Sequence, residues 1–498
     1  MKKKHTFFVL FLLGILFSQS IPNDYRMNKA LNLLNDHGLA WNFNTVFKPV
    51  LWQDIEFNNF KIEKDYHWYF NKNFFFFDDS SNIFLTKNIS KSNMSPGFFI
   101  EDSFNDSTKI NDGLVYSIYN YLYYSFNKNV YSWLYFRITN NSEHLFRYTG
   151  KSRKKSRLGF NSGETDMSGI GYFGNIFRFW IGRDRQNWGA MHFDNIAISE
   201  NSPSYDQVVL DAKVNNFKYR YFYGFLETTD LGNNRYINGR GIEYSNYKNL
   251  LIGFHEVVIY SGLNRMFDLA YLNPISTHLE IELNNRDNNF EGTGAQNAIW
   301  QLSFDYMPIK GLRLSSNILV DEIAIDFSET DTLTNGNDLG IQNRIAYSTI
   351  LLGCMTTFHF NHSYVGTYTL RHEKGENNFV SRNETLGTSL GSDMNFFEIG
   401  IIIITPWKFR FEISVSEKNN GENNILNNLY LSNSYVHNSS FPSGIVDKNK
   451  VLSLSLFYNF NDNISAIFDY NINSFNSNTY DNQLKFSINT YFSTNFIK

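Results

Sequence analysis

The stretch that decides the fold is FRFWIGRDRQNWGAMHFDNIAISENSPSY, residues 177–205. It opens as a strand, because the apolar Phe177, Phe179 and Ile181 alternate with Arg178 and Trp180. Polar side chains then surround one tryptophan, in the run Arg183, Asp184, Arg185, Gln186, Asn187, Trp188 and Gly189. An apolar strand ends in this many charged and amide groups only where they meet partners or water. The stretch therefore predicts the point at which a membrane wall passes into a polar interior.

Later parts of the chain show the same two-residue period. The clearest segments are 217–225, 300–306, 312–321, 407–415 and 484–489. In each of them one face is mostly apolar and often aromatic, while the other face is mostly polar. Strands of outer-membrane barrels alternate in this way over about ten residues. A soluble sandwich shows the same alternation, so the period alone does not decide between the two.

Composition and length favour a membrane barrel. Aromatic residues make up 17% of the 498 residues, with 48 Phe and 31 Tyr, which suits the aromatic girdles of a barrel. The single cysteine excludes an intramolecular disulfide, and the chain is too long for one sandwich. In a bilayer, a closed barrel is the β structure that pairs every backbone N–H and C=O group. We therefore predict an all-β fold, a large transmembrane antiparallel β-barrel of roughly sixteen to eighteen strands.

The N-terminus has the features of an export signal. Lysines fill positions 2–4, an apolar run covers 7–17, and small residues at 18–20 offer a cleavage site. Residues 1–20 are therefore predicted to be a signal peptide, and residues 21–498 the exported barrel. Residues 25–37 predict a short amphipathic helix within a helical or irregular segment that reaches to about residue 110.

Further strands are expected over 114–126, 131–149 and 351–357. The last of these holds Cys354, for which a buried or lipid-facing thiol is a better interpretation than a nucleophile. The basic run KSRKKSR at 151–157 is interpreted as a solvated hairpin loop. The alternative is a contact for acidic sugars or lipid phosphates.

Six pieces of the chain, in order, resemble the capsule assembly protein family called Wzi. They are IGRDRQNWG at 181–189, NIAISENSPSYD at 195–206, NGRGIEY at 238–244, GFHEVVIYSGLNRMFDLAYLNP at 253–274, NAIWQLSFDY at 297–306 and LRLSSNILVDEIAID at 312–326. The resemblance implies an outer-membrane β-barrel with short periplasmic helical elements and no catalysis. The role it implies is lectin-like, since it would hold or organise capsular or other surface polysaccharide at the cell surface.

Charged groups within apolar or aromatic sequence are the candidate site. In a barrel they are expected to point inward and pair, because an unpaired charge in a membrane is costly. Such a set would form either a lumenal ion-pair network or a patch that hydrogen-bonds sugar hydroxyls, with Trp188, Tyr260 and Tyr271 as stacking platforms. The candidates are Arg183, Asp184, Trp188, Glu256, Tyr260, Arg265, Asp268, Tyr271, Asn273, Asp321 and Glu322.

Other function classes gain less support. The net charge of −4 does not favour a nucleic-acid partner. No spacing predicts a metal, a cofactor or a catalytic triad, and the neighbours Asp321 and Glu322 would face opposite sides of a strand rather than form a glycosidase pair. We therefore predict a non-enzymatic monomer whose partners are surface polysaccharide and outer-membrane lipid or lipopolysaccharide. A porin-like channel for sugars or other small solutes is the alternative.

Overall fold

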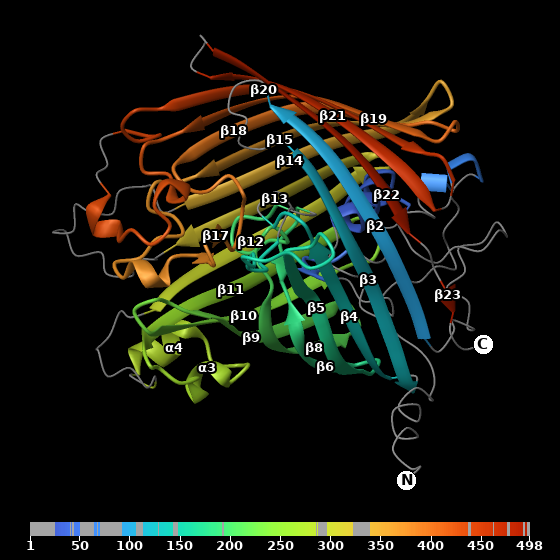
Figure 1. Cartoon of the computed structure of the whole chain (residues 1–498). Coiled ribbons are helices and arrows are strands. Elements are labelled where there is room, and N and C mark those ends of the chain that lie inside the picture. The colour runs from blue at the N-terminus through green and yellow to red at the C-terminus, as the bar shows by residue number, and fades with distance from the viewer. Residues whose placement is uncertain are drawn as a thin grey trace.

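The computed structural model is a closed antiparallel barrel of eighteen wall strands (Figure 1). It describes residues 25–39, 41, 44–49, 64–66, 68–69, 92–105, 113–127, 129–142, 148–191, 194–284, 286, 296–321, 339–436, 440–461, 463–475, 479–491 and 494–495. The predicted fold class and the upper end of the predicted strand number are confirmed.

Each wall strand pairs with its neighbour along the chain, and the last strand closes the ring on the first. The strands are β2 (Ser92–Asn105), β3 (Gly113–Asn127), β4 (Val130–Thr139), β5 (Ser162–Phe173), β6 (Phe177–Asp184), β8 (Tyr205–Val214), β9 (Phe217–Thr228), β10 (Asn233–Ser245), β11 (Leu250–Leu263), β12 (Gln296–Ile309), β13 (Leu312–Asp321), β14 (Leu339–Leu351), β15 (Cys354–Val365), β18 (Met394–Ile404), β19 (Phe409–Asn420), β20 (Asp447–Asn459), β21 (Ile464–Phe475) and β22 (Thr479–Tyr491). Closure runs from Gly97↔Tyr491 to Asn105↔Gln483 between β2 and β22. The wall therefore leaves no open edge between its first and last strands.

The alternation read from the sequence separates the two faces of the wall. On β6, Phe177, Phe179 and Ile181 are exposed on the outer side, whereas Arg178 and Trp180 are buried on the lumenal side. β13 repeats the pattern, with Arg313 buried inside and Ile318 exposed outside. Apolar side chains thus face the membrane and polar side chains face the lumen, as expected for an outer-membrane barrel.

The two ends of the barrel differ in their connections. At one end the turns are tight, such as 310–311 between β12 and β13, where Gly311 has a φ of +85°. At the other end the connections are long and include 185–204, 264–295 and 366–393. Outer-membrane barrels have short periplasmic turns and long extracellular loops, so this difference orients the chain in the membrane.

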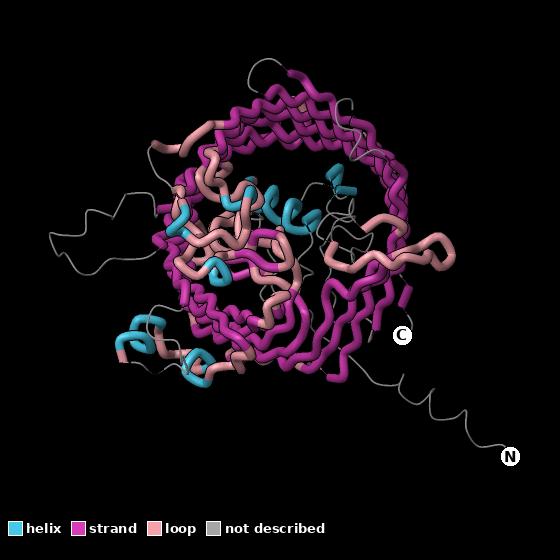
Figure 2. Tube along the Cα trace, turned by 60° about the vertical axis from the view of Figure 1, so that its left-hand side comes forward, coloured by secondary structure: helices cyan, strands magenta, loops and turns pink. Residues whose placement is uncertain are grey.

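Smaller elements lie within the ring and beside it (Figure 2). The short strand pairs are β1 (Phe47–Lys48) with β7 (Asn187–Trp188) and β16 (Val380–Ser381) with β17 (Glu384–Thr385), and β23 (Thr494–Asn495) pairs with β2. The helices are α1 (Tyr25–Asp36), α3 (Leu269–Leu272), α4 (His278–Leu283), η5 (Lys64–Tyr66), η6 (Gly375–Asn377), η7 (Ile425–Asn427) and η8 (Asn433–Tyr435). No helix in these described ranges is long and apolar enough to cross a membrane.

A plug fills part of the lumen, and we define it as α1, β1 and the loops 185–204 and 366–393. It shares one buried apolar cluster with the wall, which includes Trp188 and Leu386 of the plug and Phe222 of β9. Among the described residues, a large buried core therefore lies inside the barrel, between the plug and the lumenal face of the wall.

Several boundaries differ from those expected. The predicted helix at 25–37 is confirmed as α1, but the wall begins at Ser92, inside the segment expected to be helical or irregular to about residue 110. β4 ends at Thr139 instead of continuing to 149. The segment 351–357 is a hairpin turn rather than one strand, because Leu352 and Gly353 adopt left-handed φ values of 51° and 73° before Cys354 starts β15. The predicted signal peptide lies outside the described residues.

Candidate functional site

The stretch 177–205 leaves the wall at Asp184 and enters the plug. Trp188 is 0% exposed, with ring centroids 4.7 Å from Phe47 and 5.0 Å from Phe222. Its indole Nε1 donates to Gln186 at 3.0 Å, which satisfies the buried N–H. β7 pairs with β1 through Phe47↔Trp188, so the plug has its own small sheet. The predicted passage from a membrane wall to a polar interior is confirmed here.

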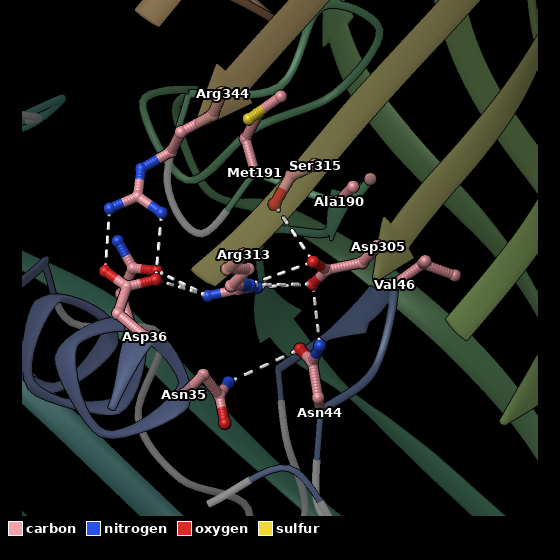
Figure 3. A network of polar contacts seen from close by, with 12 residues as sticks. Asn35, Asp36, Asn44, Val46, Ala190, Met191, Asp305, Arg313, Ser315 and Arg344 are labelled. Carbon is pink, nitrogen blue, oxygen red and sulfur yellow. Dashed lines mark hydrogen bonds and ion pairs between the residues drawn. The ribbon is translucent and has the colours of Figure 1, made fainter. Parts of the chain in front are cut away.

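A buried ion network fixes α1 to the wall (Figure 3). Arg313 of β13 donates from Nη1 to Asp36 Oδ1 at 3.0 Å and from Nε to Asp305 Oδ1 at 2.9 Å. Arg344 of β14 donates from Nη2 to Asp36 Oδ2 at 2.7 Å. Asn44 Nδ2 also donates to Asp305 Oδ2, at 2.7 Å. Burial opposes ionisation of Asp36, but Arg344 and Arg313 outweigh it and hold the pKa of Asp36 below its ordinary value.

A second set of contacts holds β1. The Glu243 carboxylate of β10 accepts from Thr45 Oγ1 at 2.7 Å and from the Val46 backbone N–H at 2.9 Å. Lys48 Nζ donates to the backbone oxygen of Met191 at 2.7 Å. Burial, together with the nearby Arg313 charge, lowers the pKa of Lys48 to about 7. The plug is thus tied to the wall through its backbone as well as its side chains.

Asp194 joins the two plug loops to each other. It accepts from the Ser389 backbone N–H at 3.0 Å, from Thr388 Oγ1 at 3.1 Å and from Asn201 Nδ2 at 2.8 Å. Burial raises the pKa of Asp194, and these hydrogen bonds only partly oppose the rise. Asp321 at the end of β13 accepts from the Leu370 backbone N–H, so the second loop is also tied to the wall.

The structure divides the predicted site residues between the two sides of the wall. Asp184, Trp188 and Asp321 belong to the lumenal network. Arg183 lies on the membrane side of β6 and pairs there with Asp206 at 3.5 Å. Glu322 lies outside the described residues. The expectation that all these charges point inward is therefore wrong for Arg183, and it is also wrong for Glu256, Arg265 and Asp268, which lie outside the barrel.

The other predicted residues gather outside the barrel. Glu256 and Tyr260 share the outer face of β11 with the exposed Phe254, because residues two apart on a strand face the same side. Arg265, Asp268, Tyr271 and Asn273 belong to the segment 264–284, which we call the outer hairpin and which contains α3 and α4. These charges are tolerated on the membrane side because they pair, with Arg240 Nε 3.3 Å from Glu256 Oε2 and Arg265 Nη2 3.4 Å from Asp268 Oδ2.

The three proposed stacking platforms are covered in this structure. Tyr260 lies between Tyr236 and Tyr271, with ring centroids 5.1 Å and 4.9 Å away. Tyr260, Tyr271 and Trp188 are all 0% exposed. Stacking of a sugar on any of these rings would therefore require the surrounding elements to open.

A region of the lumenal wall was missed by the sequence analysis. We call it the tyrosine wall, and it consists of Tyr119, Tyr121, Tyr135, Lys485 and Asn489. Tyr119, Tyr135 and Lys485 are partly exposed, whereas Tyr121 and Asn489 are buried beside them. The Tyr119 hydroxyl donates to Asn489 Oδ1 at 2.7 Å, and the Tyr119 and Tyr135 ring centroids lie 6.1 Å apart. The Lys485 side chain is 43% exposed and lies 2.7 Å from Glu101. The signal was available, since Tyr119 and Tyr121 alternate with their neighbours along β3.

The arrangement offers aromatic faces, amides and paired charges rather than a metal centre. Within the described ranges, no group of three or more His, Cys, Asp or Glu side chains could hold a metal ion. Aromatic faces suit the apolar C–H face of a sugar ring, and amides and hydroxyls suit its hydroxyl groups. The tyrosine wall therefore has groups of the kind that suit contact with a saccharide. The hydrogen bond from Tyr119 to Asn489 holds the Tyr119 ring in one orientation.

The fold and this interior define an outer-membrane β-barrel with a plug in its lumen. Comparisons with descriptions of known families and with curated protein sequences find no match. Among solved structures, the chain is similar to Wzi, described as an outer-membrane protein involved in group 1 capsule assembly in Escherichia coli and as a carbohydrate-binding β-barrel. That match has a TM-score of 0.63 and 11% identity, and covers 98% of this chain and 100% of that one.

The chain thus shares the barrel fold of Wzi and is an outer-membrane β-barrel, the fold that the resemblance of its motifs implied. OprD of Pseudomonas aeruginosa is also similar, with a TM-score of 0.47 and 12% identity over 82% of this chain and 95% of that one.

Proposed function

We propose that this chain is a non-catalytic outer-membrane barrel that binds and organises capsular or other polysaccharide at the cell surface. The observation that carries the proposal is the anchorage of the plug, which Asp36 holds to β13 and β14 and which Asp194 holds together between its two loops. A plug fixed by buried ion pairs suits retention of a ligand better than rapid passage of solute. Wzi, which is described as carbohydrate-binding, has the same fold over nearly the whole chain.

Within this proposal, the predicted site residues have two roles. Asp184, Trp188 and Asp321 maintain the lumenal network, while Glu256, Tyr260, Arg265, Asp268, Tyr271 and Asn273 hold the outer hairpin in place. The saccharide itself contacts the tyrosine wall and the long extracellular loops, including the exposed basic residues 151–157. The proposal also includes a signal peptide at residues 1–20, a monomeric state and a lipopolysaccharide-containing membrane as its surroundings.

A comparison of cells with and without this chain tests the proposal. Cells lacking the chain are expected to shed polysaccharide into the medium that complemented cells retain. The Tyr119→Ala, Tyr135→Ala double variant should lower retention while the barrel still folds, because both substituted rings face the lumen. Tyr172→Ala is the matched control, since Tyr172 is exposed on the membrane side of β5. Equal retention in all strains would contradict the proposal.

A porin-like channel is the second candidate, and the exposure of Lys485 favours it, because water reaches this side of the lumen. Reconstituted protein would then carry a steady ionic current in a planar bilayer, which a saccharide-retaining barrel would not. A hydrolase would instead release reducing ends from purified surface polysaccharide. One preparation of the full mature chain serves both the current measurement and the hydrolysis measurement.

A further inference from the structure

The outer hairpin folds back over the membrane-facing side of the wall. It leaves β11 at the long-loop end, and both views place α3 and α4 outside the ring of strands (Figures 1 and 2). Tyrosine hydroxyls of the wall hold its backbone: Tyr221 donates to the Tyr271 oxygen at 2.7 Å and Tyr236 to the Arg265 oxygen at 2.9 Å. The hairpin therefore occupies wall surface that lipid would otherwise cover.

The inner side of the hairpin shields charge. Glu256 on the outer face of β11 pairs with Arg240 and accepts from the His278 backbone N–H at 3.1 Å and from Trp300 Nε1 at 3.1 Å. Ile281 is buried beside this set. A charged pair on the membrane side of a barrel is costly, and the hairpin removes this one from contact with acyl chains.

The outer side of the hairpin is apolar and exposed. Ile275 is 81% exposed and Leu283 is 74% exposed, which would be unfavourable for a segment surrounded by water. Four more large apolar side chains of the segment are exposed: Met266, Phe267, Leu269 and Leu272. Polar groups are exposed as well, such as Glu280 of the hairpin, which forms an ion pair with Arg286 just beyond it. This mixture of apolar and polar groups suits the boundary between acyl chains and headgroups.

The hairpin also reaches far along the wall. Pro274 accepts through its backbone oxygen from the hydroxyl of Tyr219, the third residue of β9, and β9 starts at a short turn. Tyr219 is opposite Ile242 in the sheet, and Ile242 is opposite Phe254. Both Ile242 and Phe254 are exposed on the lipid-facing surface. The exposed apolar side chains of the hairpin therefore continue the apolar surface of the wall.

We propose that the outer hairpin is a lipid-anchoring element whose exposed apolar side chains contact the acyl chains of the surrounding membrane. This assignment does not depend on the saccharide proposal, since the hairpin lies on the other side of the wall from the tyrosine wall. Lipid is the expected neighbour of the hairpin, because the exposed surface of the hairpin is continuous with the surface of the wall that already faces the membrane.

Spin labels on the full mature chain test the assignment. In a Cys354→Ser background, single labels are placed at Ile275→Cys and Leu283→Cys. Phe254→Cys provides a lipid-facing reference, and Leu158→Cys, at a loop residue 97% exposed, provides an aqueous reference. The protein is reconstituted in phosphatidylethanolamine–phosphatidylglycerol vesicles, and collision rates with oxygen and with a water-soluble nickel chelate are measured. Heat-modifiable migration on gels verifies that each variant folds.

The assignment predicts that the ratio of oxygen to nickel collisions at 275 and 283 matches the ratio at 254 and exceeds the ratio at 158 severalfold. A ratio equal to that at 158 would place the hairpin in water and overturn the assignment. Dipolar broadening between labels at 275 on two chains would overturn it in favour of a second copy. Protection of both positions from both reagents would overturn it in favour of another protein partner.

Discussion

One carboxylate between two arginines decides how α1 is held inside the barrel. Asp36 accepts hydrogen bonds from Arg313 and Arg344, and Arg313 also donates to Asp305. Two carboxylates therefore balance two buried cations. Buried charges are tolerated when each has its partner, and removing one partner leaves a charge that water cannot reach. The network therefore makes the position of α1 sensitive to a single substitution.

Asp36→Asn is expected to destabilise the folded barrel by about 3–5 kcal/mol, because it leaves Arg344 without its carboxylate. The free energy of unfolding in denaturant, with the protein in detergent micelles, measures the change. Asp206→Asn is the control, since the Asp206 side chain is 69% exposed and, among the described residues, forms its ion pair with Arg183. The control should cost less than about 1 kcal/mol. Equal losses in both variants would contradict the role assigned to Asp36.

His37 adds a dependence on pH. Burial lowers its pKa to about 4, with Asp36 opposing and Lys310 assisting the shift, whereas the ordinary value is 6.5. The unfolded state therefore binds more protons between pH 6.5 and about 4, and stability falls as the pH drops through this window. Asp36, whose pKa lies below its ordinary 3.8, adds a further loss only at more acidic pH.

His37→Gln is expected to remove most of the loss of stability between pH 6.5 and pH 4. The wild-type loss from this group is roughly 3 kcal/mol at most, since one pKa unit corresponds to about 1.36 kcal/mol. Unfolding midpoints of the two proteins across this pH range provide the measurement. His362→Gln, at a partly buried position on β15, is the control and should leave the slope unchanged. A slope that His37→Gln does not alter would contradict this account.

At the scale of elements, the plug is a set of short segments joined by side chains rather than a folded domain. The two loops 185–204 and 366–393 meet at Asp194, and Ser199 Oγ donates to the Gly387 oxygen at 2.7 Å. Most of these contacts join a loop to another loop or to the wall. The positions of the two loops therefore depend on the rigid wall of the barrel, to which they are bound.

Asp194→Ala is expected to loosen loop 366–393 from loop 185–204, because the donors from Thr388 and Ser389 lose their acceptor. In planar bilayers the variant should show a larger or more frequent current than the wild type. Glu373→Ala, an exposed position in the same loop, is the control and should behave like the wild type. Identical currents from all three proteins would show that Asp194 does not hold the loop in place.

At the scale of the whole molecule, pairing between β2 and β22 gives hydrogen-bond partners to the backbone groups of the last two strand edges of the wall. A barrel that lacks its final strand exposes unpaired N–H and C=O groups on two strands, which a bilayer does not tolerate. Stability of the wall is thus a property of the complete ring rather than of any one hairpin.

Deletion of residues 479–498 is expected to abolish the folded barrel, since β2 and β21 would each lose the partner strand on one side. Heat-modifiable migration after refolding in detergent measures the outcome. Deletion of only residues 496–498 is the control and should fold normally. A truncated chain without β22 that still shows heat-modifiable migration would contradict this reasoning.

The sequence anticipated the wall much better than the site. The segment 312–321 was predicted as a strand from its alternation and matches β13, because the period of a strand is a local property. The same rule, applied to β11, could have placed Glu256 with Phe254 on the outer face. A charge in a barrel is generally expected to face the lumen, and the hairpin that covers Glu256 comes from residues that follow β11 in the chain.

The closed barrel, with its apolar exterior and polar lumen, can be predicted from the order of residues alone. Side-chain alternation specifies which residues share a face, and in a bilayer the β structure must be a closed sheet. The partners of the charged groups become visible only in the folded molecule, where Asp36 lies between two wall arginines and Glu256 lies beneath the outer hairpin. Those pairings join segments that are far apart in the chain or that fold back on the wall, and local patterns carry no information about such contacts.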